Sequence, residues 1–277
     1  MNLSIPNDPW LPRSPVTRYL IVVNLFVWFM GALGDVLGIE MINTETILFQ
    51  FGLFPTAVVE DGSIWTPFTH MFLHGNGTHL LVNMLGLFLL GPDVERTFGT
   101  FSFLVLYLLS GFVGGAGYML FSYLVLGQVH PVVGASGAIM GILGAIVAIY
   151  PQRVYVILPL MIPLRASTLA VLMLTAHLFF MFTPYGGMVA YDVHLYGGLT
   201  GFGFAWWVSW QHACKVRKQA PDLDPERDVA ELETLVVRLA RADEPFSEEE
   251  RARYDFLREA LRYQDVLTLE EVRGQEA

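Results

Sequence analysis

A glycine-rich apolar stretch, VGASGAIMGILG, occupies residues 133–144 and carries no charge. Gly137, Gly141 and Gly144 fall at i, i+4 and i+7, so they line one face of a helix. Small residues let helix backbones approach each other closely within lipid. The stretch therefore predicts a central membrane helix with its neighbours packed against the glycine face.

Ser136 is the one hydroxyl in this stretch, and two interpretations compete for it. The commoner role of a membrane serine is to hydrogen-bond a neighbouring helix. The alternative is a nucleophile held between glycines, where a substrate backbone can reach it. The serine alone does not separate these interpretations, so the other polar groups at its depth have to.

The composition indicates a membrane body followed by a charged tail. Of 277 residues, 54% are hydrophobic and 15% charged, against roughly 25% charged in a soluble domain. From Lys215 onward the chain holds 11 Lys/Arg and 17 Asp/Glu, which is the composition of a solvated segment. The single cysteine, Cys214, excludes an internal disulfide.

Six stretches approach the length of about 20 apolar residues that a spanning helix needs. They are Tyr19–Ile39, Thr78–Gly91, Phe101–Leu126, Val132–Tyr150, Ala166–Phe182 and Val189–Trp210. The second is short, and we expect it to extend upstream through Phe68–Leu73. The predicted fold class is therefore an all-α membrane protein with six transmembrane helices and a short soluble helical tail.

Basic residues set the expected orientation, because Lys and Arg favour cytoplasmic loops. With the N-terminus inside, all those before the tail fall on the inner side: Arg13, Arg18, Arg96, Arg153 and Arg165. The three outer loops, near residues 40–77, 127–131 and 183–188, contain none. Both ends of the chain are therefore expected to be cytoplasmic.

Two connections are too apolar for free loops. Residues 40–77 predict a structured, partly embedded outer lobe, because irregular backbone at membrane depth must pack on protein or face water. The segment Val154–Leu164 contains Pro159 and Pro163, which argue against a seventh span. We expect it to be re-entrant or interfacial.

The tail predicts a helical hairpin. Asp224-Pro225 has the pattern of a helix start, and the apolar positions of residues 229–239 form one stripe. Ser247 with Glu250 reads as a capping box ahead of a second helix. The hairpin is the candidate contact for a homo-oligomer.

Four polar side chains are predicted to lie at similar depth near the outer boundary. Ser136 is four residues into one span, His194 five residues into another, and His79 and Asn83 share one face of a third. Gly197 and Gly201 lie below His194 and allow close approach to the glycine face of the Ser136 helix. Each of the four alone could serve packing equally well, but polar groups inside lipid are functional candidates.

Together these side chains are suited to acyl transfer. A histidine hydrogen-bonded to Ser136 can take its proton and return it to a leaving amine. His79, Asn83 and the Ser136 backbone N–H could stabilise the oxyanion that develops. No acidic third member is evident.

Ordered motifs carry a family resemblance: Gly134-x-Ser136-Gly137, His194-x-x-Gly197-x-x-x-Gly201, His70-x-x-x-His74-x-x-x-x-His79-x-x-x-Asn83 and Gly91-x-x-x-Glu95-x-x-x-Gly99. Each motif is weak alone, but in this order over about residues 15–210 the set resembles the rhomboid family of intramembrane serine proteases. The resemblance implies cleavage of transmembrane substrates by a Ser136–His194 dyad, with His79, Asn83 and the Ser136 amide at the oxyanion. His70, His74 and Glu95 match positions that look structural, as do Gly134, Gly137, Gly197 and Gly201.

The composition, the expected orientation and the resemblance together predict a domain layout and a location. We expect a cytoplasmic lead-in at residues 1–16, a rhomboid domain at 17–212 and an acidic cytoplasmic tail at 213–277. The expected partners are transmembrane proteins and the lipid bilayer, with no nucleic acid, no cofactor and no metal. No organelle address is evident, so the expected location is a bacterial cytoplasmic membrane.

Two residues depart from the family pattern. Thr66 follows Trp65 where many members have arginine, which removes an expected loop anchor. Met140 stands one turn after Ser136, where the family often has an aromatic stacked on the catalytic histidine. Methionine can pack on an imidazole but holds it less rigidly, so these departures concern rate more than chemistry.

Three alternatives compete with the interpretation as a protease. A rhomboid-like protein that only binds or escorts transmembrane segments would have lost Ser136 or His194, and both are present. A metal site on His70, His74 and His79 lacks the His-Glu-x-x-His pattern and an obvious carboxylate ligand. A transporter would show internal repeats with broken helices, and none is found.

Overall fold

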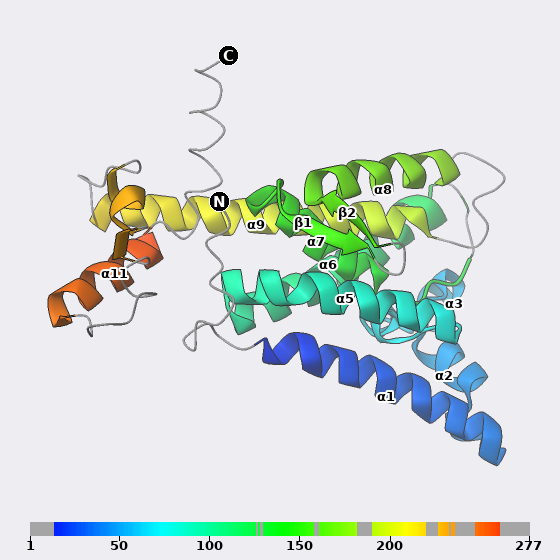
Figure 1. The fold of residues 1–277 in the computed structure, drawn as a ribbon. Helices are drawn as coiled ribbons and strands as arrows, with labels where there is room; N and C mark the ends of the chain where they lie inside the picture. The colour runs from blue at the N-terminus through cyan, green and yellow to red at the C-terminus, as the bar shows by residue number, and fades with distance from the viewer. Residues whose placement is uncertain are drawn as a thin grey trace. The chain divides into compact units, whose positions relative to one another are not determined.

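The computed structural model describes residues 14–125, 127, 130–157, 161–181, 190–219, 227–232, 234–235 and 247–260. These residues are mostly helical, with one two-stranded sheet (Figure 1). The elements before the glycine-rich stretch are α1 (Pro15–Leu37), η1 (Glu40–Ile42), α2 (Thr44–Phe51), α3 (Pro55–Glu60), α4 (Thr66–Thr69), η2 (His70–Phe72), α5 (Gly77–Phe98), α6 (Thr100–Gly117) and η3 (Tyr118–Tyr123). The elements from the glycine-rich stretch onward are α7 (Ser136–Ile149), β1 (Val154–Ile157), β2 (Ile162–Arg165), α8 (Ala166–Met181), α9 (Tyr191–Gln219) and α11 (Glu248–Ala260).

Three helices in the described part of the chain are long and apolar enough to cross a bilayer. They are Pro15–Leu37, Gly77–Phe98 and Thr100–Phe121. The helices Ser136–Ile149 and Ala166–Phe180 are apolar but shorter. The chain is thus a helical membrane protein, while the count of six spans stays a prediction.

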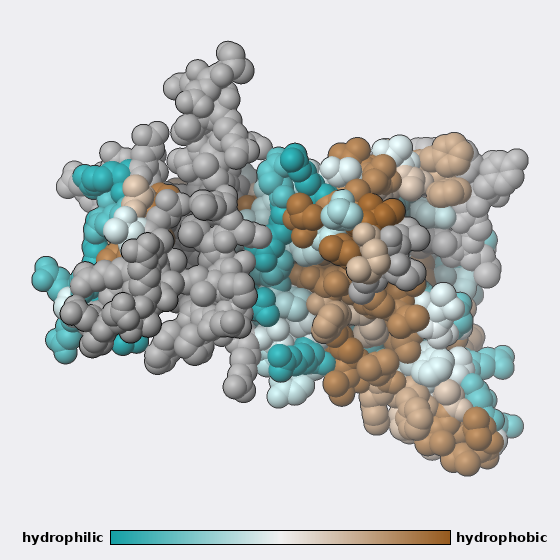
Figure 2. Space-filling model, in the orientation of Figure 1, coloured by the Kyte–Doolittle hydropathy of each residue, from teal (hydrophilic) through white to brown (hydrophobic). Residues whose placement is uncertain are grey.

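The surface of these helices is strongly apolar. Large hydrophobic side chains are exposed along α1, α5 and α8, including Phe26, Phe29, Leu81, Phe88 and Phe179. Figure 2 shows apolar side chains gathered in a broad band over this part of the molecule. Exposed apolar area of this extent fits contact with lipid rather than water.

α1 is anchored to α5 at its first turn. The carboxylate of Glu95, which is 1% exposed, accepts bonds from the backbone N–H of Val16 at 2.9 Å and of Thr17 at 2.8 Å. It also accepts from the Thr17 hydroxyl at 2.7 Å. These N–H groups have no partner within their own helix, and a negative charge there is favourable. Glu95 therefore has a structural role, but not beside the site. It lies sixteen positions after His79, about 24 Å along the helix at 1.5 Å per residue.

The expected upstream extension of the second span is wrong. The side chain of Asn76 accepts a hydrogen bond from the backbone N–H of His79 at 2.8 Å, and this cap starts α5 at Gly77. The helix instead continues downstream through Pro92 to Phe98. Residues 70–72 form a separate short turn.

The all-α prediction is also wrong at the connection between α7 and α8. Val154–Ile157 and Ile162–Arg165 pair as an antiparallel hairpin, with Val154 opposite Arg165 and Ile157 opposite Ile162. β-branched residues favour this conformation, and Pro163 is tolerated because each strand of a two-stranded sheet has a free edge. Tyr155 donates to Asp93 at 2.7 Å, which joins the hairpin to α5.

The outer lobe is structured, as predicted. It contains α2, α3, α4 and η2, and the indole of Trp65 donates to the carbonyl of Gln50 at 2.9 Å. Leu53 is fully buried and pairs with Val132 through two backbone hydrogen bonds of 3.0 and 2.9 Å. The lobe is thereby tied to the segment that leads into α7.

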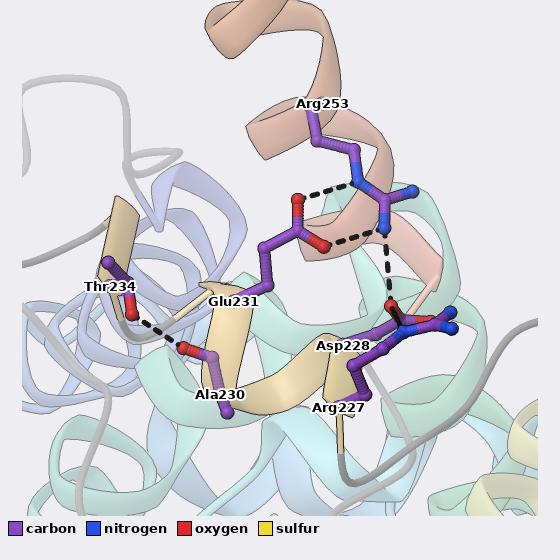
Figure 3. Close-up of polar contacts among 6 residues, drawn as sticks. All are labelled: Arg227, Asp228, Ala230, Glu231, Thr234 and Arg253. Carbon is purple, nitrogen blue, oxygen red and sulfur yellow. Dashed lines mark hydrogen bonds and ion pairs between the residues drawn. The ribbon is translucent and has the colours of Figure 1, made fainter.

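The chain divides into two compact units, of which the second contains residues 148–150 and 205–277. Within it, residues 227–232 and 234–235 are helical, and Leu232 packs with Leu257 of α11. Arg253 binds Glu231 at 2.7 Å and the buried Asp228 at 3.2 Å (Figure 3). The capping box is confirmed, because Ser247 Oγ accepts from the backbone N–H of Glu250 at 3.2 Å and the Ser247 backbone N–H donates to the Glu250 carboxylate at 3.0 Å.

Two predictions from the sequence are not decided by these contacts. The expected helix start at Asp224-Pro225 lies outside the described residues. The domain boundaries at 16/17 and 212/213 stay predictions.

Candidate active site

Ser136 is the first residue of α7, not four residues into a helix as expected. Gly134, two residues earlier, has φ +124, a conformation that residues with a Cβ rarely adopt. Its backbone N–H donates to the carbonyl of His70 at 2.9 Å. The conformation of Gly134 therefore keeps the helix from starting earlier, and Ser136 lies at the N-terminal end of α7, where helix N–H groups have no intrahelical partner.

The predicted close contact between the Ser136 helix and the last helix is present. A Cβ on Gly197 would collide with the carbonyl group of Gly137, and one on Gly201 with that of Gly141. Gly144 approaches the carbonyl of Gly198 in the same way. Three consecutive turns of α7 and α9 thus touch backbone to backbone.

This contact brings Ser136 and His194 together. The hydroxyl oxygen of Ser136 lies 2.6 Å from Nε2 of His194, within the range of a strong hydrogen bond. Serine is at the start of α7 and histidine in the first turn of α9. A hydroxyl bonded to an imidazole nitrogen is the arrangement that activates a serine nucleophile.

A second histidine, His177 of α8, contacts His194 from the other side and was missed from the sequence. Its Nε2 lies 2.5 Å from Nδ1 of His194, and its Nδ1 lies 2.5 Å from the carbonyl oxygen of Met173. The two rings meet edge to face at 4.7 Å. The available signal was an ionisable residue inside the apolar stretch Ala166–Phe182, which is itself a functional candidate.

His177 also accounts for the departure at Met140. Met140 lines a cavity of about 200 Å³ with both histidines and with apolar residues of α7, α8 and α9. The ring packed on His194 comes from α8 instead of from position 140. Tyr191 packs edge to face on His177 at 5.3 Å and stacks on Phe180 at 5.8 Å, so aromatic rings support His177 in turn.

His79 and Ser136 both lie close to Gly134. A Cβ on Gly134 would lie 2.7 Å from the His79 ring and 3.7 Å from the Ser136 hydroxyl. Asn83 is 5% exposed, and its Nδ2 donates to the His79 carbonyl at 2.8 Å. Glycine at 134 thus leaves room for the imidazole next to the nucleophile, with Asn83 one turn further along α5.

The other motif residues have contacts of a structural kind. His70 is fully buried against Gly115 of α6, and His74 is 3% exposed and packs edge to face on His79 at 5.1 Å. Thr66, at the position where many family members have arginine, is 1% exposed. Its hydroxyl donates to the Ser63 carbonyl at 2.8 Å and so closes a local turn. Within the described ranges, no three His, Cys, Asp or Glu side chains are grouped as a metal ion would require.

Comparison with known proteins agrees with this architecture. A family model for the rhomboid domain matches residues 61–211. The chain is 38% identical over 104 residues to the rhomboid protease GluP of Bacillus subtilis, which is 38% of this chain and 19% of that protein. It is 34% identical over 149 residues to the rhomboid protease AarA of Providencia stuartii, 47% of this chain and 49% of that protein.

A third similarity is with the putative rhomboid protease YdcA of Bacillus subtilis, at 34% identity over 132 residues, 47% of this chain and 60% of that protein. The chain thus spans at most 60% of the length of these three relatives. Because the rhomboid model covers more than half of the chain, this protein belongs to the rhomboid family. It is a multi-pass membrane protein by that membership and by its apolar helices.

Proposed function

We propose that this protein is an intramembrane serine endopeptidase that cleaves transmembrane segments of membrane-protein substrates. The observation that carries the proposal is the 2.6 Å hydrogen bond between Ser136 and His194. In the reaction, Ser136 Oγ attacks the scissile carbonyl while its proton passes to Nε2 of His194. The proton then goes to the leaving amine as the C–N bond breaks.

Water completes the cycle. It attacks the acyl-enzyme, loses a proton to His194, and the proton returns to Ser136 as the acid product leaves. No metal or cofactor takes part in this scheme. The contact of α7 with α9 holds the two reacting groups within hydrogen-bond reach, which is what an effectively intramolecular reaction needs.

The oxyanion site belongs to the same proposal. The Ser136 backbone N–H is at the start of α7, where helix N–H groups have no intrahelical partner and carry partial positive charge. His79 lies against Gly134, on the same side as the Ser136 hydroxyl. The Ser136 backbone N–H, His79 and Asn83 would together donate to the oxygen on which negative charge develops.

The proposal includes the membrane orientation expected from the sequence. Both ends of the chain would be in the cytoplasm of a bacterium and the dyad near the outer boundary, because the outer loops hold no Lys or Arg before the tail. The domain layout 1–16, 17–212 and 213–277 and a homo-oligomer through the tail are part of the same proposal.

Fluorophosphonate labelling of the purified protein in detergent tests the dyad. Wild type should be labelled and should cleave a model transmembrane substrate, and Ser136→Ala should do neither. Ser110→Ala is the matched control, because Ser110 is a fully buried serine of α6 outside the site. An unlabelled wild type, or a Ser136→Ala variant that cleaves normally, would leave the alternative of a rhomboid-like protein that only binds transmembrane segments.

His194→Ala gives the second arm of this test. Removing any single member of a catalytic unit lowers the activity of the enzyme to a similar extent. We expect His194→Ala to be as inactive as Ser136→Ala while keeping wild-type thermal stability. A His194→Ala variant that keeps most of its cleavage rate would contradict the assignment.

A further inference from the structure

We infer that His177 is a positioning residue, the third member of a neutral Ser136–His194–His177 relay that is anchored on the backbone carbonyl of Met173. This inference rests on the proposed function, because it concerns how the base of that reaction is held. No carboxylate was found for this place from the sequence. The three hydrogen bonds of 2.6, 2.5 and 2.5 Å form one continuous chain from the hydroxyl to the carbonyl.

For a neutral His177, the carbonyl fixes the direction of every bond in this chain. A backbone carbonyl only accepts hydrogen bonds, so Nδ1 of His177 must carry a hydrogen and donate to Met173. A neutral imidazole with a hydrogen on Nδ1 has a lone pair on Nε2. Nε2 of His177 therefore accepts, and Nδ1 of His194 must be the donor between the two rings.

The inferred relay places an uncharged His177 ring in apolar surroundings. The cavity that both histidines line is otherwise formed almost wholly by aliphatic and aromatic side chains and glycine. Placing a cation against apolar surface without a counter-charge is costly. A neutral ring avoids that cost and completes both of its hydrogen bonds.

The consequence is that His194 is held in the tautomer that a general base needs. With its hydrogen on Nδ1, His194 presents the lone pair of Nε2 to the Ser136 hydroxyl. The opposite tautomer would present an N–H to the serine and could not take its proton. The group behind the catalytic histidine of serine proteases has this same role, and there it is usually a carboxylate.

The relay also acts when charge develops. After Nε2 of His194 takes the serine proton, its Nδ1–H still donates to Nε2 of His177, and His177 still donates to Met173. No bond to His177 forms or breaks, so His177 positions the base without reacting. A carboxylate here would bring a permanent charge into the membrane, whereas imidazole supplies the acceptor without one.

Packing adds rigidity to the same arrangement. His177 meets His194 edge to face at 4.7 Å and is itself flanked by Tyr191 at 5.3 Å. These rings come from α8 and the start of α9, so the relay links two neighbouring helices. Orientation by ring contacts alone would need only shape, whereas orientation by the relay needs an acceptor atom at the position of Nε2.

Three substitutions at one position separate these two roles. His177→Phe keeps an aromatic ring without an acceptor. His177→Gln places an amide oxygen at about the reach of Nε2, and His177→Asn carries the same group one methylene shorter. Thr175→Ala is the control, because it changes an exposed side chain of the same helix outside the relay.

We expect His177→Phe and His177→Asn to lower kcat and the rate of fluorophosphonate labelling by roughly 10- to 10²-fold, with KM unchanged. This loss is below the about 10⁴-fold cost of the wrong tautomer in a carboxylate-supported site, since the neutral acceptor stabilises the base less. His177→Gln should stay within about fivefold of wild type, and Thr175→Ala should match it.

Several results would overturn the inference. Wild-type kcat in folded His177→Phe would exclude a relay. A loss in His177→Gln as large as that in His177→Phe would also overturn it, because an acceptor atom at this position would then not restore the rate. A rise in KM at unchanged kcat would make the residue a substrate contact. Where His177→Phe fails to fold, the comparison of Gln with Asn decides. Failure of the protease proposal is distinguishable, because wild type itself would then not be labelled.

Discussion

Replacing Gly201 with alanine tests the helix contact on which the candidate site depends. A Cβ at position 201 would lie 2.6 Å from Cα of Gly141, and closer still to its carbonyl group. Ordinary contacts of a Cβ begin near 3.4 Å, so relief of the contact with Cα alone would require α7 and α9 to separate by at least about 0.8 Å. Close-packed helices have no slack to absorb such a change locally.

The separation matters because the dyad is two turns away on the same helix pair. Ser136 and His194 are 2.6 Å apart, and a shift of this size would bring them to about 3.4 Å, beyond a normal hydrogen bond to a hydroxyl. A displacement of about 1 Å at a reacting group costs on the order of 10² in rate. We therefore expect Gly201→Ala to lower the labelling rate by roughly 10- to 10²-fold.

The assay is fluorophosphonate labelling of detergent-purified protein, followed over time, with cleavage of a model transmembrane substrate in parallel. Gly203→Ala is the matched control: it makes the same substitution on the same helix, and a Cβ there meets nothing within 4 Å. Wild-type labelling of Gly201→Ala would refute the reasoning. So would an equal loss in Gly203→Ala, because the effect would then not come from the contact.

Further predictions concern the oxyanion site, the α1 anchor and the tail. Asn83→Ala should slow cleavage by roughly 10²–10³-fold, with residual activity above that of Ser136→Ala; wild-type kinetics would reduce Asn83 to packing. Glu95→Gln should lower stability by about 1.5–3 kcal/mol through weakened charge-assisted bonds, read as a lower Tm with labelling retained at low temperature, and an unchanged Tm would contradict the anchor. The hydrogen bond from Arg253 lowers the pKa of Glu231. The protection of residues 227–232 and 248–260 against hydrogen exchange, corrected for the intrinsic exchange rate, should therefore fall as the pH drops below about 4.5, the ordinary Glu value. Arg253→Met should remove that pH dependence, and an identical profile in this variant would assign it to another group.

Patterns that depend on local spacing were predictable from the sequence. The glycine face of residues 137–144 and the pair Gly197 and Gly201 predicted a backbone contact, since only small residues permit one. The capping box at Ser247 depends on two residues three apart, and it too is present. In both cases the information lies in residues three or four positions apart on the same helix.

The misses depend on what lies far away in the sequence. Ser136 begins α7 because Val132 and Gly134 are bonded to the outer lobe, which no local pattern reveals. The hairpin after α7 came from a run that hydropathy alone does not separate from a membrane segment. His177 was passed over because its partner is seventeen residues away on another helix, although its place in an apolar stretch was a sufficient reason to consider it.

The hydrogen bonds that attach the nucleophile segment to the outer lobe join main-chain atoms. Leu53 pairs with Val132, and Gly134 donates to the carbonyl of His70. No side-chain exchange removes a backbone carbonyl, and only proline removes an N–H. Side chains of the lobe can therefore be exchanged, as at Thr66 where many family members have arginine, without removing the hydrogen bonds that hold the nucleophile segment.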